Sequence, residues 1–235
     1  MLLYIYLFLF LSTIIFYMFN KNLHIYNYGI KTTNSYNILI VGGTHGNEPA
    51  SSLSLYRLAR YLKHKNIRNS FITIIPMVNK TGFYTNNRYN NHFLKNYDIN
   101  RNYPKKYYIN TILSDMIKEY DMIIDHHEGY NYHVSNKNSI GSTISPVNFE
   151  TSMLDKILNK LNKHIKSRDK KFVFNSKHSY PIGSLRNYIV EKFPKKKYLL
   201  IETTGITNRD TMYERQFKAL YIILSILLDK DVIAL

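Results

Sequence analysis

The sequence contains no cysteine and no tryptophan in its 235 residues. Without cysteine the chain cannot form disulfide bonds, thiolate zinc sites or iron–sulfur clusters, and it cannot use a cysteine nucleophile. Any metal ion must therefore be bound by His, Asp or Glu side chains. The atoms left to bind a metal ion are therefore carboxylate oxygens and imidazole nitrogens.

Acidic residues are also scarce, with 16 Asp and Glu against 32 Lys and Arg, which gives a formal net charge of +16. Such a charge raises nucleic acid or an anionic membrane as partners, because Lys and Arg neutralise phosphates. The basic residues, however, form only short runs, of which residues 195–197, 170–171 and 105–106 are the densest. Short runs are typical of solvated loops, so we expect no nucleic-acid partner. Apolar residues make up 45% of the chain, which excludes a disordered protein and allows one domain with a buried core.

One long apolar run stands at the amino terminus, where residues 1–19 contain no charge, proline or glycine. A helix of that length spans roughly 30 Å, enough to cross a membrane. No basic residue precedes the run and no small-residue cleavage site follows it, which favours an uncleaved, single-pass membrane anchor over a signal peptide that would release a secreted protein. We expect a polar linker over residues 20–36 and one folded domain over residues 37–235.

Apolar strands alternate with amphipathic helices along this domain. The strands are expected at residues 37–41, 71–78, 122–127, 172–175 and 198–203, and the helices at residues 49–63, 111–120, 153–165, 182–192 and 209–228. This alternation predicts an α/β fold with a mixed, largely parallel sheet sandwiched between helices. Residues 79–106 and 128–150 lack a period and are predicted to be loops, and loops of that length are usually functional.

Polar side chains follow several of the predicted strands. His45 and Glu48 lie in a glycine-rich turn after the first strand, with a spacing that lets both bind one metal ion. At the end of another strand, alternation directs Asp125 and His127 to one face and His126 to the other. Glu202 ends an apolar strand, where burial raises the pKa of a carboxyl toward that of a useful base. Taken singly, each group also has an ordinary explanation as a polar residue that ends a strand.

Taken in order, these residues belong to a set of motifs. The motifs are GGTHGNE at 42–48, NKTGFYTNNR at 79–88, YDINRNYP at 97–104, DHHEG at 125–129 and IET at 201–203. Together they resemble the zinc carboxypeptidase superfamily, most closely its branch of succinylglutamate desuccinylases and aspartoacylases. The resemblance covers nearly all of residues 37–228 and implies a zinc carboxypeptidase-like fold. Two positions depart from the pattern: Lys80 replaces the usual proline, and His126 stands between Asp125 and His127.

The resemblance implies a role for each of seven residues. One zinc ion per chain would be bound by His45, Glu48 and His127; Glu202 would be the general base, Arg88 would stabilise the oxyanion, and Asn100 with Arg101 would bind a substrate carboxylate. The implied reaction is hydrolysis of an amide bond adjacent to a carboxylate by a metal-activated water. The expected substrate is a small acidic N-acyl amino acid or peptide.

Two other functions stay open at the level of sequence. The first is a zinc metallocarboxypeptidase that acts on peptides, which would use the same residues. The second is a catalytically inactive, membrane-tethered binding protein on the same fold. Outside the motifs, Arg186 and Arg209 have two interpretations, as residues that bind an anionic substrate or as residues that cap and solvate helices, and we favour the second. Tyr130, Tyr132 and His133 are weaker candidates for the pocket wall.

Overall fold

The computed structural model describes residues 4–7, 23–92, 95–129, 140–175, 180–204 and 209–228. Its centre is a seven-stranded sheet with the strand order β1-β3-β2-β6-β9-β7-β8. These strands are β1 (Tyr26–Gly29), β2 (Tyr36–Gly42), β3 (Ser70–Ile75), β6 (Met122–Gly129), β7 (Thr143–Val147), β8 (Val173–Phe174) and β9 (Lys197–Thr204). Neighbouring strands within β3-β2-β6-β9 are parallel, whereas β1 pairs antiparallel with β3 and β7 pairs antiparallel with β9. The predicted mixed, largely parallel sheet is therefore confirmed.

The central strands form because their sequences are apolar on both faces. Residues Ile38, Leu39 and Ile40 of β2 are completely buried, and β6 and β9 begin with similar apolar runs. Continuous apolar sequence is typical of parallel strands that are covered by helices on both sides. The polar residues of β6 and β9 come only at the carboxyl ends of the strands, where the site lies.

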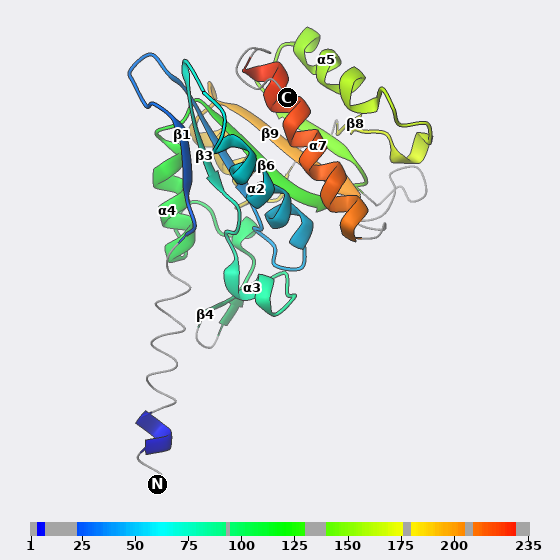
Figure 1. Ribbon diagram of the computed structural model, residues 1–235. Helices are drawn as coiled ribbons and strands as arrows, with labels where there is room; N and C mark the ends of the chain where they lie inside the picture. The colour runs from blue at the N-terminus through cyan, green and yellow to red at the C-terminus, as the bar shows by residue number, and fades with distance from the viewer. Residues whose placement is uncertain are drawn as a thin grey trace.

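Helices cover both faces of this sheet. One face packs against α2 (Pro49–Leu62), α5 (Thr151–Asn162) and α7 (Arg209–Leu227), and the other against α4 (Tyr108–Ile117) and α6 (Leu185–Lys192). Figure 1 shows α2 and α7 side by side over the sheet, with α5 next to α7. Alternate residues of β6 divide between the two faces, since Met122 and Ile124 join the α2/α7 side and Ile123 joins the α4/α6 side.

Three segments expected to be irregular contain regular structure. The predicted linker over residues 20–36 contains β1, and the predicted loop over 128–150 contains β7. The predicted loop over 79–106 contains α3 (Lys80–Tyr84), a hairpin of β4 (Asn90–His92) with β5 (Lys95–Tyr97), and the 3₁₀ turn η1 (Ile99–Arg101). The expectations were wrong because these elements are short and polar. β1 and β5 are mostly exposed, and β7 reads TISPV, so none shows the apolar alternation of a half-buried strand.

The expected membrane anchor over residues 1–19 lies almost entirely outside the described residues. Of this segment the structure describes only residues 4–7, which are helical. In the part of the chain that is described, no helix has both the length and the apolar character needed to span a membrane.

Candidate active site

The first site residues lie on the tight turn between β2 and α2. Gly43 has a positive φ of +62°, a conformation that glycine adopts without strain. At Gly46 the turn touches the backbone of α3, since a Cβ there would lie 1.9 Å from the carbonyl carbon of Gly82. Pro49 then begins α2. The glycines of the GGTHGNE motif thus allow the turn to fold back and hold His45 and Glu48 over the sheet.

His45, Glu48 and His127 form one buried cluster. The Nδ1 atom of His45 lies 2.6 Å from Oε1 of Glu48, and Nδ1 of His127 lies 2.8 Å from Oε2 of the same carboxylate. The candidate ligand atoms of the three residues all lie within 4.8 Å of one another, as one metal ion requires. A His₂Glu set is a donor combination found in catalytic zinc sites, where a fourth position stays open. The structure therefore brings together the three residues expected to bind metal.

A carboxylate also lies close to the Nε2 atom of each histidine. Oδ1 of Asp98 lies 3.3 Å from Nε2 of His45, and Oδ1 of Asp125 lies 3.1 Å from Nε2 of His127. Such partners fix the orientation of a histidine ligand and raise its basicity. Both aspartates belong to motifs recognised in the sequence, yet they received no role there. The arrangement of the two histidines and their carboxylates fits a divalent metal ion.

His126 lies on the opposite face of β6, as strand alternation predicts. It is completely buried on the side covered by α2 and α7, and burial lowers its pKa to about 4. His127 instead faces Glu48 and His45. The ambiguity between the two adjacent histidines is thereby resolved in favour of His127.

The electrostatics of the cluster reflect its buried charges. Burial acts to raise the pKa of Glu48, but the two neighbouring histidines outweigh it and hold that pKa well below its usual value. For His127, burial acts to lower the pKa, while Asp125 and Glu48 outweigh it and hold the pKa well above its usual value. In the protein without metal, a carboxylate and an imidazolium therefore stabilise each other.

Glu202 lies beside the cluster on the neighbouring strand. In the parallel pairing of β6 and β9, Glu202 is directly opposite His127. The side chain is buried, and this burial raises the pKa of Glu202 to about 7. A carboxyl group with a pKa near neutrality can both accept and return a proton, which is what a general base in hydrolysis does.

Arg88 reaches the cluster from the segment between α3 and β4. Its Nε and Nη2 atoms each lie 3.0 Å from Oδ2 of Asp98, and its Nη1 lies 3.4 Å from Nδ1 of His45 and 3.7 Å from Oε1 of Glu48. Asp98 thus bridges Arg88 and His45. The guanidinium is therefore held at the edge of the cluster of His45, Glu48 and His127.

A cavity of about 450 Å³ opens over these groups. His45, Glu48, His127, Glu202 and Arg88 line it together with Asn100 and Arg101, so all seven predicted site residues share one pocket. Asn100 has a structural task as well, because its Oδ1 accepts a 2.8 Å hydrogen bond from the backbone N–H of Leu185 at the start of α6. Arg101 is exposed and forms no ion pair within the described part of the chain.

Of the two interpretations of Arg186, the structure fits the less favoured one better. Arg186 lines the cavity, with its guanidinium carbon 3.7 Å from the centre of the Tyr180 ring. An arginine near the start of a helix gives no sequence signal for such stacking. The weaker candidates Tyr130, Tyr132 and His133 lie outside the described residues, as does the side chain of Arg209.

Comparison with protein families gives one match. Residues 34–130 match the family model described as the succinylglutamate desuccinylase/aspartoacylase catalytic domain. This stretch contains the metal-ligand set, Arg88, Asn100 and Arg101. Among curated protein sequences, none matches this chain.

Solved structures share the fold. The tripeptide-bound cell shape determinant Csd4 from Helicobacter pylori superposes with a TM-score of 0.70 at 14% identity, over 88% of this chain and 56% of that chain. The mDAP-bound form of Csd4, a D,L-carboxypeptidase, gives a TM-score of 0.68 at 15% identity, over 86% and 54% of the two chains. A protein named as a candidate metallopeptidase from Shewanella denitrificans gives 0.64 at 17% identity, over 86% and 78%.

This chain spans just over half the length of the Csd4 chains that it matches. The family match over residues 34–130 and the shared fold together support the resemblance predicted from the motifs, namely a zinc carboxypeptidase-like fold that is similar, over this stretch, to the succinylglutamate desuccinylase/aspartoacylase catalytic domain.

Proposed function

We propose that this protein is a zinc-dependent hydrolase that removes the acyl group from an acidic N-acyl amino acid. The observation that carries the proposal is the placement of Glu202 directly beside His127 in the sheet, in the same cavity as the metal-ligand set and Arg101. A metal site, a base of suitable pKa and a group that binds anions are the parts that amide hydrolysis next to a carboxylate requires.

Each of the chain's own groups has a place in this reaction. Glu202 accepts the proton of the attacking water and transfers it to the leaving amine, which a buried carboxyl with a pKa of about 7 can do in both directions. Arg88, held by Asp98, stabilises the charge that develops on the carbonyl oxygen. When bound at His45, Glu48 and His127, a zinc ion would polarise the water and the scissile carbonyl.

Arg101 and Asn100 are proposed to bind the substrate carboxylate. A planar guanidinium can donate two parallel hydrogen bonds to a carboxylate, and Arg101 forms no ion pair with another described residue that would compete. The Asn100 oxygen is occupied by Leu185, so its amide nitrogen is the group left to face a substrate. The leaving amine would thus belong to an amino acid with a free carboxylate.

A metallocarboxypeptidase that acts on peptides is the second candidate function. It is favoured by the fold shared with Csd4, a D,L-carboxypeptidase that has been crystallised with a tripeptide. Both candidates cleave an amide bond adjacent to a carboxylate and use the same residues. The third reading, an inactive binding protein, is disfavoured because the ligands, the base and the oxyanion arginine all line one cavity.

The first experiment measures the metal content of the full chain, purified in a neutral detergent without added metal. We expect one zinc ion per chain, loss of this ion in His127→Ala and its retention in His126→Ala, which is a matched control because His126 is the adjacent residue on the other face. A folded wild-type protein that binds no zinc even when zinc is supplied would contradict the metal-dependent mechanism.

The second experiment compares substrates. We expect hydrolysis of N-succinyl and N-acetyl derivatives of acidic amino acids, with no activity when the α-carboxylate is amidated. A preference for tripeptides with a free carboxyl terminus would instead establish the carboxypeptidase. Activity that is indifferent to the carboxylate would remove the proposed role of Arg101.

We also propose that residues 1–19 anchor the protein in a membrane, because this run has the length and apolar character of a spanning helix. The test is extraction of membranes with alkaline carbonate. We expect the wild-type chain to stay in the membrane pellet and a Leu9→Arg, Ile14→Arg variant to be released. A mature chain whose mass shows loss of this segment would support cleavage and secretion instead.

A further inference from the structure

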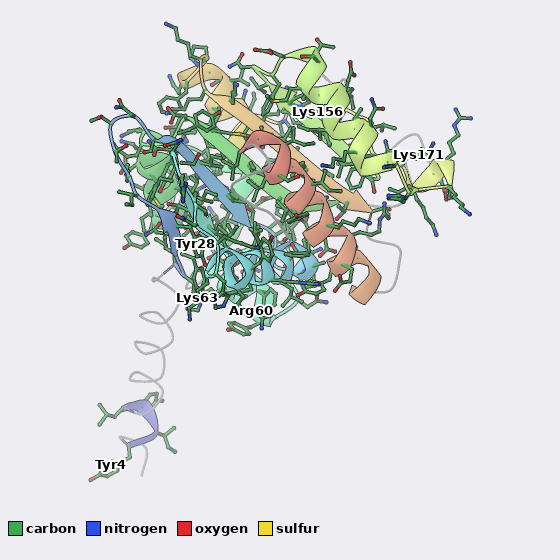
Figure 2. All side chains as sticks on the ribbon, turned by 45° about the horizontal axis from the view of Figure 1, so that its top comes forward. Tyr4, Tyr28, Arg60, Lys63, Lys156 and Lys171 are labelled. Carbon is green, nitrogen blue, oxygen red and sulfur yellow. The ribbon has the colours of Figure 1, made fainter. Side chains whose placement is uncertain are left out.

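A second cavity, of about 630 Å³, lies apart from the active site, between the end of α5, the segment around η2 (Arg168–Lys170) and α7. No residue lines both cavities. Figure 2 labels Lys156 on α5 and Lys171 just after η2, and the lining residues between positions 160 and 170 lie between these two lysines in the sequence. We call this second cavity the basic pocket.

The basic pocket is lined by six cationic residues and no acidic one. The cations are Lys160, Lys163, Lys166, Lys170, Arg215 and Lys218. Within the described part of the chain, none of these five lysines forms an ion pair. Like charges gathered in one hollow repel one another, and an anion bound among them relieves that repulsion.

Two acidic residues are adjacent in sequence to lining residues. Glu214, next to Arg215 on α7, pairs with Arg57 of α2. Asp169 accepts a hydrogen bond from the hydroxyl of the lining residue Ser167, and this bond together with the charge of Lys170 lowers the pKa of Asp169. Asp169 therefore offsets part of the positive charge at this edge, but no acidic residue lines the basic pocket itself.

The floor of the basic pocket consists of buried core residues. Leu161, Phe172 and Ile222 line it and belong to the buried core, at 7%, 4% and 8% exposure. Arg215 is fixed by hydrogen bonds from Nη2 to the backbone oxygen of Lys170 at 2.7 Å and to Oγ of Ser142 at 3.3 Å. The lysines thus surround a preformed hollow.

We propose that the basic pocket binds a compact polyanion, a small molecule that carries two or more phosphate groups. Six cations line one concave site, and this arrangement suits a ligand whose negative charges lie close together. A flat bilayer surface cannot enter a hollow whose floor is formed by Leu161, Phe172 and Ile222, whereas a small anion can. An isolated carboxylate would leave most of the six cations uncompensated.

The test measures binding of inorganic tripolyphosphate to the full chain by isothermal titration calorimetry at 0.15 M NaCl, in neutral detergent. We expect saturable binding at one site per chain, weakened about tenfold or more when the salt is raised to 0.5 M, because screening shortens the reach of the charges. Sulfate at equal ionic strength should not compete. Absence of saturable binding at millimolar tripolyphosphate would overturn the proposal.

Two charge-matched variants locate the site. The pocket variant combines Lys163→Gln, Lys166→Gln and Lys218→Gln; the control variant combines Lys156→Gln, Lys192→Gln and Lys195→Gln, three exposed lysines that do not line the basic pocket. We expect the pocket variant to bind at least tenfold more weakly and the control less than twofold more weakly. Equal losses in both would show binding by net charge alone and would contradict a specific site.

Other ligands serve as competing outcomes. If single-stranded DNA or vesicles with anionic lipid bind and tripolyphosphate does not displace them, the small-molecule assignment is wrong.

All six substitutions are at exposed lysines, so we do not expect the variants to unfold. The double variant Lys166→Gln, Lys218→Gln provides a milder second test. His127→Ala should bind tripolyphosphate like wild type, so this proposal stands or fails independently of the catalytic one.

Discussion

The hydroxyl of Tyr198 donates a 2.8 Å hydrogen bond to Oδ2 of Asp125 on the neighbouring strand. The other carboxylate oxygen of Asp125 lies 3.1 Å from Nε2 of His127. All three side chains are buried, with exposures of 1 to 2%. A series of polar contacts thus runs from the core of the sheet to the proposed metal ligand, whose Nδ1 atom faces Glu48.

Removal of this support should weaken metal binding. We expect Asp125→Asn to lower zinc affinity by about 10- to 100-fold, as is typical for partners of histidine ligands, and Tyr198→Phe to lower it by less than about tenfold. Competition with a chromophoric chelator measures both. Tyr188→Phe is the control, since Tyr188 is buried in the same core cluster but does not line the pocket. If Asp125→Asn binds zinc like wild type, the proposed orientation of His127 is wrong.

The contact between Gly46 and Gly82 predicts a second effect on the metal site. In Gly46→Ala, the added methyl would collide with the backbone of α3 at 1.9 Å, so the turn that carries His45 and Glu48 must move. We expect zinc affinity to fall at least tenfold while circular dichroism stays close to wild type. Ala50→Gly, at the start of α2, is a nearby control; comparable zinc loss in both variants would point to the helix and not to the contact.

Glu202 should affect chemistry without affecting the metal. In Glu202→Gln the proton acceptor is lost, and we expect kcat to fall by about 10² to 10⁴ with zinc content unchanged. Steady-state kinetics and metal analysis of the same preparation check this. A variant that retains more than a tenth of wild-type kcat would exclude Glu202 as the base.

The raised pKa of Glu202 also predicts a pH dependence of stability in the metal-free protein. Burial raises this pKa from 4.5 to about 7, so the folded state binds the proton more tightly than the unfolded state. The wild-type chain should therefore lose stability relative to Glu202→Gln as the pH rises from about 4.5 to about 7, by up to about 3 kcal/mol. Urea unfolding of both proteins with chelator present measures it. A constant difference across this window would contradict the shift.

Asn100 should contribute to folding as well as to binding. Its side-chain oxygen accepts the N–H of Leu185 in the first turn of α6, while the Ser184 hydroxyl accepts the N–H of Asn187. We expect Asn100→Ala to lower the free energy of unfolding by about 1 kcal/mol, because a helix N–H loses its acceptor. Asn100→Asp keeps an acceptor and should be nearly as stable as wild type. Thermal unfolding compares them, and a destabilisation shared equally by both variants would refute the capping role.

The sequence predicted that His45, Glu48 and His127 lie together because the motifs keep their order and because strand alternation separates His127 from His126. It also placed Glu202 at the end of a buried strand, where the structure has it. These inferences depend on local spacing and on a two-residue period, both of which can be read along the chain.

The remaining features depend on contacts between distant segments. Asp98 and Asp125 stood inside recognised motifs, but their contacts with His45 and His127 exist only in the folded protein. The stacking of Arg186 on Tyr180 has no counterpart in sequence. Similarly, β7 contains serine and proline, so its place beside β9 is determined by pairing and not by an apolar pattern.

The pairing of His127 with Glu202 has a consequence for engineering. Neighbouring strands in a sheet lie about 4.8 Å apart, so backbone hydrogen bonds set the distance between the proposed metal ligand and the proposed base. Arg101, Tyr180 and Arg186, by contrast, lie outside the sheet. A library that randomises these three positions can therefore change which substrates are accepted while the distance between reacting groups stays constant, which makes the fold a suitable starting point for directed evolution.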